Sequence, residues 1–360
     1  MKNDLMKIAL INTIKPAEGT GDGMTEYTYQ LYSRFSESNS VDLIYSVDKL
    51  IRNNVKGLLY TNTIFKNKIS KIKWEKYDIV HITNQEMGFA AKLIKKSNSR
   101  VKVITTIQDF ARVDKGVQKG MLQRAYNRIV RGSIVDAFKY SDLILFTSSQ
   151  TEKDADKYFR PNYKKETIHL AVRESILKAP IHKKRNKIFT VGYVGSLAFH
   201  KNVIMILKTA NLMKDKSCNF IIYGKGIEYD SLLQFKNKYE LKNVKFMGFA
   251  PENEIAKIYD SFDAFMFPSM YEGFGLPILE AQSRGLPVIV YRKGKVPKEV
   301  TRYCFKAGSP KDASRIITGL QKRGCPEEKH TRATKYARNF SWDACAKNTM
   351  RKYISITKRD

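Results

Sequence analysis

The sequence contains few cysteines, few prolines and no long apolar run. Its four cysteines, Cys218, Cys304, Cys325 and Cys345, are widely spaced and form no C-x-x-C pair, so we expect neither a disulfide framework nor a zinc site, and a reducing compartment is the default. No stretch approaches the roughly 20 apolar residues that cross a bilayer. Because 42% of the residues are hydrophobic and only 10 are proline, disordered and collagen-like chains are excluded. We expect a globular protein that is neither exported nor threaded through a membrane.

Acidic residues are scarce relative to basic ones. The chain carries 35 Asp and Glu against 65 Lys and Arg, which gives a net charge of +30 and a pI near 9.8. The excess is spread over both halves of the sequence, unlike a basic tail. This charge implies an anionic partner such as nucleic acid, anionic lipid or a phosphorylated substrate, and it does not choose among them.

Short β-branched runs alternate with longer amphipathic segments along the whole chain. This rhythm is typical of βα repeats around a parallel sheet, and two such series predict an α/β chain of two doubly wound, Rossmann-like domains. The expected strands of the first series are 8–11, 41–45, 79–82, 101–105 and 143–147, and those of the second are 188–194, 220–223, 244–247, 264–267 and 288–291.

A charged segment at 174–187, which contains Pro180, breaks the apolar periodicity and reads as a linker. We therefore predict an N-terminal domain at 1–178 and a C-terminal domain at 179–339. Residues 340–360 are predicted to form a final amphipathic helix. Ligands of open parallel sheets bind beyond the carboxyl ends of the strands, so two such domains face to face would enclose a central cleft.

The most informative segment is 267–290, FPSMYEGFGLPILEAQSRGLPVIV. A strand ends at Phe267, a loop with Gly273 and Gly275 follows, and Pro277 suits the first position of a helix. Such a loop brings backbone N–H groups and the positive end of a helix to one place, and its glycines permit close approach. This arrangement favours a phosphate group.

Two carboxylates flank this candidate phosphate site. Glu272 lies in the loop, and Glu280 lies on the predicted helix. A carboxylate beside a phosphate is unfavourable unless it has another task, such as accepting hydrogen bonds from sugar hydroxyls. The alternative is that Glu280 only complements the helix dipole and Glu272 is a solvated loop residue.

The segment EGFGLPILEA closely resembles the signature of the retaining glycosyltransferases of family four, which have the GT-B fold. The resemblance extends over nearly the whole chain, because other family landmarks occur in the family order. These are YDIVHITNQ at 77–85, DLILFTSSQTEKD at 142–154, YVGSLAFHKN at 193–202, VKFMGF at 244–249 and FSWDA at 340–344.

The resemblance implies transfer of a sugar from a UDP- or GDP-linked donor with retention of anomeric configuration, and it implies no metal or other cofactor. By this resemblance, 1–178 would be the acceptor-side domain, 179–339 would bind the nucleotide sugar, and the helix at 340–360 would cross back to the first domain. Glu280 would bind the donor ribose. Lys201, on the loop after Gly195, would stabilise the charge of the departing diphosphate. The candidate catalytic residues are Lys201, Glu272 and Gln108. The donor sugar and diphosphate would meet Glu272 together with the backbone of Gly273, Phe274, Gly275 and Leu276.

Two positions depart from the family pattern. Many relatives have an arginine in the loop that here carries Ser196 and His200, so either His200 is charged in the complex or a basic residue from elsewhere substitutes. Gln108 stands where the family commonly has histidine. A glutamine amide donates and accepts hydrogen bonds but does not titrate, which weakens the case for a histidine general base.

Two further donor contacts are predicted with alternatives open. Gly23, in the glycine-rich stretch 19–23, would let the backbone approach the donor phosphates, or the stretch is a plain turn. Phe249 would lie against the nucleobase, or it packs in the core.

Asp154 and Asp156 superficially match a D-x-D metal motif, but residues two apart on a helix diverge by about 200°, so we assign no metal.

Part of the basic excess falls on a predicted amphipathic helix at 118–131. Such a helix would lie on anionic lipid headgroups, or it is a solvated helix packed on the sheet. Its basic residues are Lys119, Arg124, Arg128 and Arg131, and a second basic cluster consists of Arg292, Lys293, Lys295 and Lys298.

These features together predict a retaining hexosyltransferase that acts on a lipid-linked or cell-surface glycan acceptor. It would be cytoplasmic and peripheral on the inner face of the cell membrane, with no nucleic-acid partner. One alternative is a GT-B protein that binds a nucleotide sugar without turnover. Only the net charge supports a nucleic-acid-binding protein. A nicotinamide dehydrogenase, with Asp42 or Asp48 as its ribose acid, is disfavoured because 12–18 is too long for a tight turn.

Overall fold

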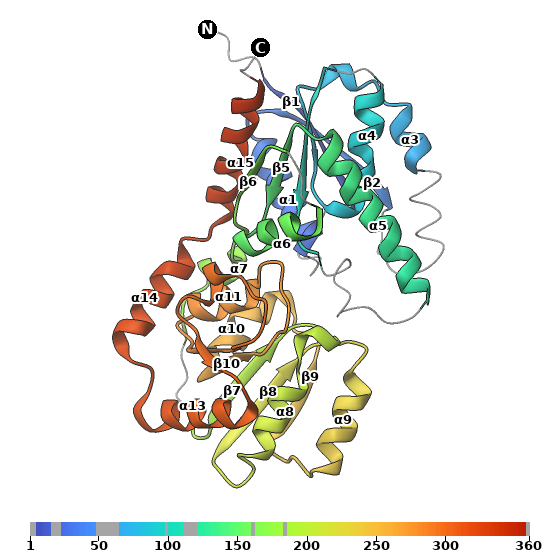
Figure 1. Cartoon of the computed structure of the whole chain (residues 1–360). Helices are drawn as coiled ribbons and strands as arrows, with labels where there is room; N and C mark the ends of the chain where they lie inside the picture. The colour runs from blue at the N-terminus through green and yellow to red at the C-terminus, as the bar shows by residue number, and fades with distance from the viewer. Residues whose placement is uncertain are drawn as a thin grey trace. The chain divides into compact units, whose positions relative to one another are not determined.

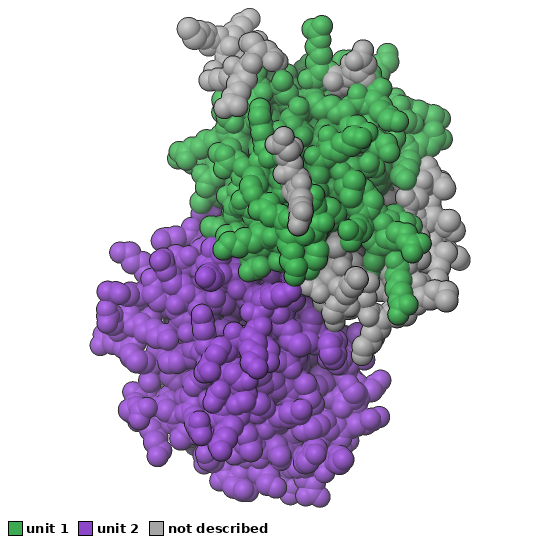
Figure 2. Space-filling view, viewed as in Figure 1, with its two compact units in different colours: residues 1–170, 342–360 green, residues 171–341 purple. Residues whose placement is uncertain are grey.

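The computed structural model describes residues 5–15, 23–47, 65–97, 100–110, 121–159, 163–182 and 186–357. The chain divides into two compact units (Figure 2). Unit 1 comprises Met1–Leu170 together with Trp342–Asp360, and unit 2 comprises Ala171–Ser341.

Unit 1 is built on a parallel sheet of six strands in the order β2-β1-β3-β4-β5-β6. The pairing of β1 with both β2 and β3 is the crossover expected of a doubly wound domain. The strands are β1 (Lys7–Ile14), β2 (Ser40–Val47), β3 (Ile79–Ile82), β4 (Lys102–Ile107), β5 (Leu143–Phe146) and β6 (Lys165–Thr167).

Helices cover both faces of this sheet (Figure 1). Alternate residues of the strands point to opposite faces, so Ala9 and Ile11 join the apolar cluster beneath α4, whereas Leu10 is buried on the other side. The helices of unit 1 are α1 (Gly23–Phe35), α3 (Lys66–Ser70), α4 (Phe89–Lys96), α5 (Met121–Tyr140), α6 (Ser149–Phe159), α15 (Trp342–Thr357) and the 3-10 turns η2 (Trp74–Lys76) and η3 (Gln85–Met87).

The C-terminal helix α15 packs on unit 1, as predicted (Figure 1). The ring of His81 is buried and makes two hydrogen bonds. Its Nδ1 lies 2.5 Å from the hydroxyl of Tyr353 on α15, and its Nε2 lies 2.7 Å from the hydroxyl of Thr106 on β4. Lys352 donates to Glu166 at 2.6 Å. Burial lowers the pKa of His81 to about 3, so the ring is neutral and its two nitrogens join the helix to the sheet.

Unit 2 repeats the architecture, with strand order β12-β11-β10-β7-β8-β9. Its strands are β7 (Phe189–Val194), β8 (Cys218–Tyr223), β9 (Val244–Gly248), β10 (Ala264–Phe267), β11 (Val288–Tyr291) and β12 (Phe305–Ala307). Its helices are α7 (Glu174–Lys178), α8 (Ile204–Asn211), α9 (Tyr229–Lys238), α10 (Ile255–Asp260), α11 (Leu276–Ser283), α12 (Lys298–Thr301), α13 (Pro310–Arg323), α14 (Glu327–Arg338) and the 3-10 turns η5 (Phe199–Lys201) and η6 (Glu252–Glu254). The prediction of two doubly wound α/β domains is confirmed.

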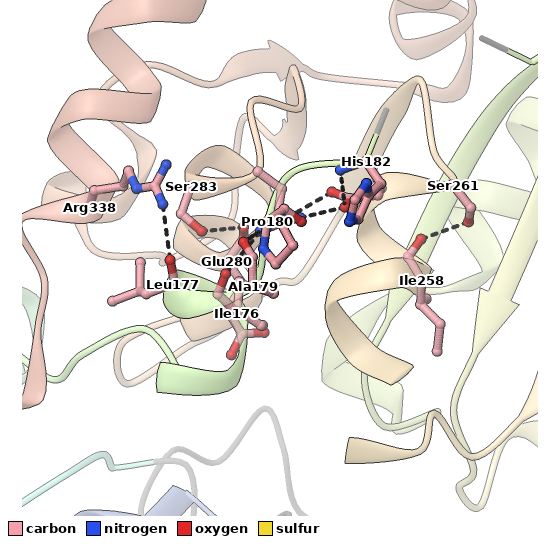
Figure 3. A network of polar contacts seen from close by, with 12 residues as sticks. Ile176, Leu177, Ala179, Pro180, His182, Ile258, Ser261, Glu280, Ser283 and Arg338 are labelled. Carbon is pink, nitrogen blue, oxygen red and sulfur yellow. Dashed lines mark hydrogen bonds and ion pairs between the residues drawn. The ribbon is translucent and has the colours of Figure 1, made fainter. Parts of the chain in front are cut away.

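The boundary between the units falls at 170/171, whereas the sequence predicted 178/179. The reason is a set of hydrogen bonds from Arg284, which lies just after α11. Its guanidinium donates to the carbonyl oxygens of Ile176 at 3.1 Å, Ala179 at 2.7 Å and Pro180 at 2.7 Å. Figure 3 shows these three acceptor residues within one network of polar contacts. The first part of the expected linker is therefore an ordered element of unit 2.

Candidate functional site

The loop that follows β10 is held between two other segments of unit 2. The N–H of Met270 donates to the carbonyl oxygen of His200 at 2.7 Å. On the other side, the N–H of Glu272 donates to Lys295 at 3.0 Å, and the N–H of Lys295 donates to Met270 at 2.8 Å. This backbone pairing places the glutamate loop beside η5, the segment that carries Lys201.

Lys201 and Glu272, two of the predicted catalytic residues, contact each other. Lys201 Nζ lies 2.7 Å from Glu272 Oε1, and the two side chains are only 16% and 10% exposed. The ammonium also lies 5.5 Å from the centre of the Phe267 ring at the end of β10. A positive and a negative group therefore meet in a largely desolvated position, where electrostatic interactions are stronger than in water.

The start of α11 has the predicted glycine geometry. Gly275 has φ of 97°, a left-handed conformation that favours glycine, and Pro277 lies in the first turn. Phe274 is buried, and its ring packs 6.0 Å from that of Phe340. The side chain of Phe274 is therefore not available to a ligand, whereas Gly273 and Leu276 are partly exposed.

Glu280 is almost completely buried and is held by two other side chains. Arg173 donates to both carboxylate oxygens, from Nε to Oε1 at 2.7 Å and from Nη2 to Oε2 at 2.9 Å. The hydroxyl of Tyr259 donates to Oε2 at 2.8 Å. Burial, followed by the charge of Glu280, raises the pKa of Tyr259 well above its usual value, so this hydroxyl remains a donor. No sequence motif points to Arg173, because 107 residues separate it from Glu280.

The loop after β7 shows why Gly195 is a glycine. A Cβ atom there would lie 2.8 Å from the Tyr193 hydroxyl, which donates to the carbonyl oxygen of Ser196 at 2.8 Å. His200 is partly buried, and its pKa is lowered by burial and then by the charge of Lys201, against an opposing effect of Glu272. A neutral His200 is the form favoured near pH 7, so a second basic residue would have to come from elsewhere.

Phe249 does not belong to the core. It is 64% exposed and follows Gly248, which has φ of 73°. The core-packing alternative for Phe249 is therefore excluded, and its contact with a nucleobase stays a prediction.

The comparisons with known proteins point to one family for unit 2. The family model described as "Glycosyl transferases group 1" matches residues 175–340. The matched region is less than half of the chain, so unit 2 is similar to this family. Strand β7, the Lys201–Glu272 pair, Gly275 and Glu280 all lie within the matched glycosyl transferases group 1 region.

Curated relatives of known activity match part of the chain. O-antigen chain mannosyltransferase B of Escherichia coli is 30% identical over 170 residues, which are 45% of this chain and 44% of that protein. The UDP-Gal:alpha-D-GlcNAc-diphosphoundecaprenol alpha-1,3-galactosyltransferase of Escherichia coli is 25% identical over 236 residues, 61% of this chain and 59% of that protein. The chain thus spans about half the length of these curated relatives.

The fold extends the similarity to both units. HepE of Anabaena, solved in complex with UDP and glucose, superposes with a TM-score of 0.74 over 97% of this chain and 100% of that chain, at 16% sequence identity. The architecture of the whole chain is therefore that of the GT-B fold, as predicted.

In unit 1, Gln108 directly follows β4 and is buried. Its side-chain Nε2 donates to the carbonyl oxygen of Thr83 at 3.1 Å, and its backbone N–H donates to Gln85 Oε1 at 3.0 Å. Gly23 is the exposed first residue of α1, and a Cβ atom there would meet nothing within 4 Å. The rest of the glycine stretch, 19–22, lies outside the described residues.

The basic helix corresponds to α5. Arg124, Arg128 and Arg131 are exposed on it, and the Arg131 guanidinium lies 5.5 Å from the centre of the Phe159 ring. Lys119 lies outside the described residues. In the part of the chain that the structure describes, no helix has the length and apolar character needed to span a membrane.

The D-x-D pair has separate partners on α6. Asp154 is buried and accepts a hydrogen bond from Gln150 at 3.1 Å, whereas Lys165 donates to Asp156 at 3.0 Å. The two carboxylates therefore have different hydrogen-bond partners. Among the described residues, no three His, Cys, Asp or Glu side chains gather into a possible metal site.

Proposed function

We propose that this chain is a retaining hexosyltransferase that moves a hexose from a UDP- or GDP-linked donor to a lipid-linked or cell-surface glycan acceptor. The observation that carries the proposal is the 2.7 Å contact between Lys201 and Glu272, at the loop that leads into the glycine-started helix α11. Unit 2 thus brings three groups together there: a cation for a diphosphate, Lys201; a carboxylate for sugar hydroxyls, Glu272; and the backbone at the start of α11.

In the proposed reaction, the bond from the sugar C1 to the diphosphate oxygen breaks, and the acceptor hydroxyl oxygen forms its bond to C1 on the same face. The acceptor proton passes to the departing phosphate oxygen. Lys201 stabilises the negative charge that develops on this leaving group. Glu272 then accepts hydrogen bonds from the donor sugar rather than abstracting a proton.

The partners are proposed on the chemistry of relatives as well as on charge. UDP and glucose are bound in the HepE structure, and the galactosyltransferase relative has UDP-galactose as donor and a diphosphoundecaprenol-linked acceptor. With a net charge of +30 and exposed arginines on α5, a peripheral contact with anionic lipid at the cytoplasmic face fits a lipid-linked acceptor. The donor itself would be a substrate, and the reaction would need no metal.

The test combines donor binding with turnover. Thermal-shift measurements with UDP, GDP and ADP, then with their sugars, identify the nucleotide, because a ligand that binds only the folded state raises its stability. Donor hydrolysis and transfer are then measured for Lys201→Ala and Glu272→Ala, with the exposed Lys208→Ala on α8 as the matched control. Unchanged turnover in both site variants would overturn the proposal.

Two observations favour a second candidate, a nucleotide-sugar-binding protein without turnover. Gln108 offers no titratable group where the family commonly has histidine, and the pKa of His200 is lowered, which removes a second cation from the η5 loop. A calorimetric signal for the donor, together with no product after long incubation, would select this candidate.

A further inference from the structure

Glu280 has a partner of its own at the point where unit 2 begins. We propose that Arg173 is a positioning residue of the donor site, which holds Glu280 so that one carboxylate oxygen faces a ribose hydroxyl. The inference rests on the proposed function, because it takes Glu280 as the ribose-binding residue.

The contact between Arg173 and Glu280 fixes both the place and the plane of the carboxylate. Two parallel N–H···O bonds of 2.7 and 2.9 Å join the planar guanidinium to the two oxygens of Glu280. A fork of this kind constrains orientation in a way that a single lysine nitrogen does not. Arg173 is itself held at its third nitrogen, because Nη1 donates to Glu252 Oε2 at 2.7 Å.

The hydrogen-bond pattern leaves Glu280 with an asymmetric capacity. Among the described residues, Oε2 accepts from both Arg173 and Tyr259, whereas Oε1 accepts from Arg173 alone. An ionised carboxylate has about four acceptor positions, so one position remains, on Oε1. Glu280 would therefore accept from one of the two vicinal ribose hydroxyls and not from both.

The charge of Arg173 has a second effect. Glu280 is 1% exposed, and an unpaired carboxylate at such burial is strongly unfavourable. Arg173 makes it possible for an anion to remain within α11 while retaining an acceptor for the ligand. Glu280 lies eight residues after Glu272 along the chain, and the helix that carries it begins where the loop that carries Glu272 ends.

The experiment measures discrimination between ribose and deoxyribose ligands. Calorimetry gives the Kd of UDP, 2′-deoxy-UDP and 3′-deoxy-UDP, and of the GDP series, for the full chain. For the wild-type protein we expect one of the two deoxy ligands to bind at least about 10-fold more weakly than the parent, as for the loss of one hydrogen bond to a charged group. In Arg173→Lys and in Glu280→Gln this ratio should fall to within about 3-fold of unity.

A purely structural role would behave differently. It would weaken the parent and deoxy ligands by the same factor and leave their ratio unchanged. Arg284→Lys is the matched control. The Arg284 side chain is more deeply buried than that of Arg173, at 1% against 24% exposure, and its hydrogen bonds go to Asp260 and to carbonyl oxygens of 176–180, not to Glu280. We expect this variant to lower the melting temperature and to keep the wild-type ratio.

The outcomes separate the two proposals. If the wild-type chain binds neither series, the proposed function fails. If it binds one series with a clear ratio, and folded Arg173→Lys keeps that ratio, the positioning role of Arg173 is overturned and the proposed function stands. Tyr259→Phe supplies a second variant should Arg173→Lys not fold. This substitution frees an acceptor position on Glu280 Oε2, so the second deoxy ligand should then also bind more weakly than the parent.

Discussion

Arg284 and Asp260 form a buried ion pair, with Nε 2.8 Å from Oδ1 and side chains that are 1% and 4% exposed. The same arginine donates to three carbonyl oxygens of the segment that enters unit 2, and the N–H of His182 donates to Asp260 Oδ2 at 3.0 Å. The Arg284 side chain therefore joins α10 and α11 to the segment 176–180, which is called the connector below. The pair has no place in the proposed chemistry, and its effect should be seen in stability.

Removal of one member of this pair should strongly destabilise the protein. Arg284→Met leaves Asp260 charged and buried without its partner, which typically costs about 3–5 kcal/mol. Urea unfolding of the full chain should show this loss. Arg315→Met, at a side chain 68% exposed, should change the free energy of unfolding by less than about 0.5 kcal/mol. Equal effects of the two substitutions would contradict the assigned importance of the buried pair.

The neutral His81 predicts how stability depends on pH. Its pKa is lowered by burial to about 3 in the folded protein, against about 6.5 when unfolded. The unfolded chain therefore binds one more proton between these values, so stability is lost as pH falls below about 6.5. At about 1.4 kcal/mol per pH unit, the contribution of His81 between pH 6.5 and 5 is about 2 kcal/mol. Unfolding of His81→Asn should be less dependent on pH than that of the wild type over this range.

Glycine substitutions distinguish packing from ligand approach. Gly224 has φ of 154°, and a Cβ atom there would lie 1.9 Å from the carbonyl oxygen of Gly195, so Gly224→Ala should lower the melting temperature and displace the loop after β7 that carries Gly195. A Cβ atom at Gly23 meets nothing within 4 Å. Gly23→Ala should therefore keep its melting temperature and weaken donor binding by obstructing the phosphates. Undiminished donor affinity in Gly23→Ala would show that the stretch 19–23 is a plain turn.

The sequence was most informative where one local pattern determines one local structure. The buried strands 79–82, 264–267 and 288–291 were predicted at their observed bounds, because a short, mostly apolar run between turn residues is typical of a strand that is buried in a parallel sheet. The edge strands β6 and β12 were not predicted, since Lys165–Thr167 and Phe305–Ala307 are only three residues long and half-exposed. Such strands depend on the neighbour with which they pair rather than on their own residues.

The candidate site shows the same division. The pairing of Lys201 with Glu272 follows from two motifs, each at the carboxyl end of a predicted strand. The contact of Arg173 with Glu280 spans 107 residues and depends on how the connector packs beside α11. Arg173 precedes the short helix α7, and nothing in the neighbouring sequence indicates that its partner is Glu280. Long-range ion pairs of this kind are decided by tertiary packing, so single-sequence patterns do not reveal them.

The exposed arginines of α5 lead to the last prediction, which concerns a membrane surface. Each basic residue near an anionic surface contributes about 1 kcal/mol to binding, so Arg124→Glu with Arg128→Glu should reduce binding to phosphatidylglycerol vesicles by at least about 30-fold. Binding to phosphatidylcholine vesicles should be weak for all variants. Lys208→Glu with Lys238→Glu, which reverses two exposed charges of unit 2, is the control for net charge alone. If both double variants lose the same affinity, the surface of α5 has no special role and attraction is due to the overall charge of the chain.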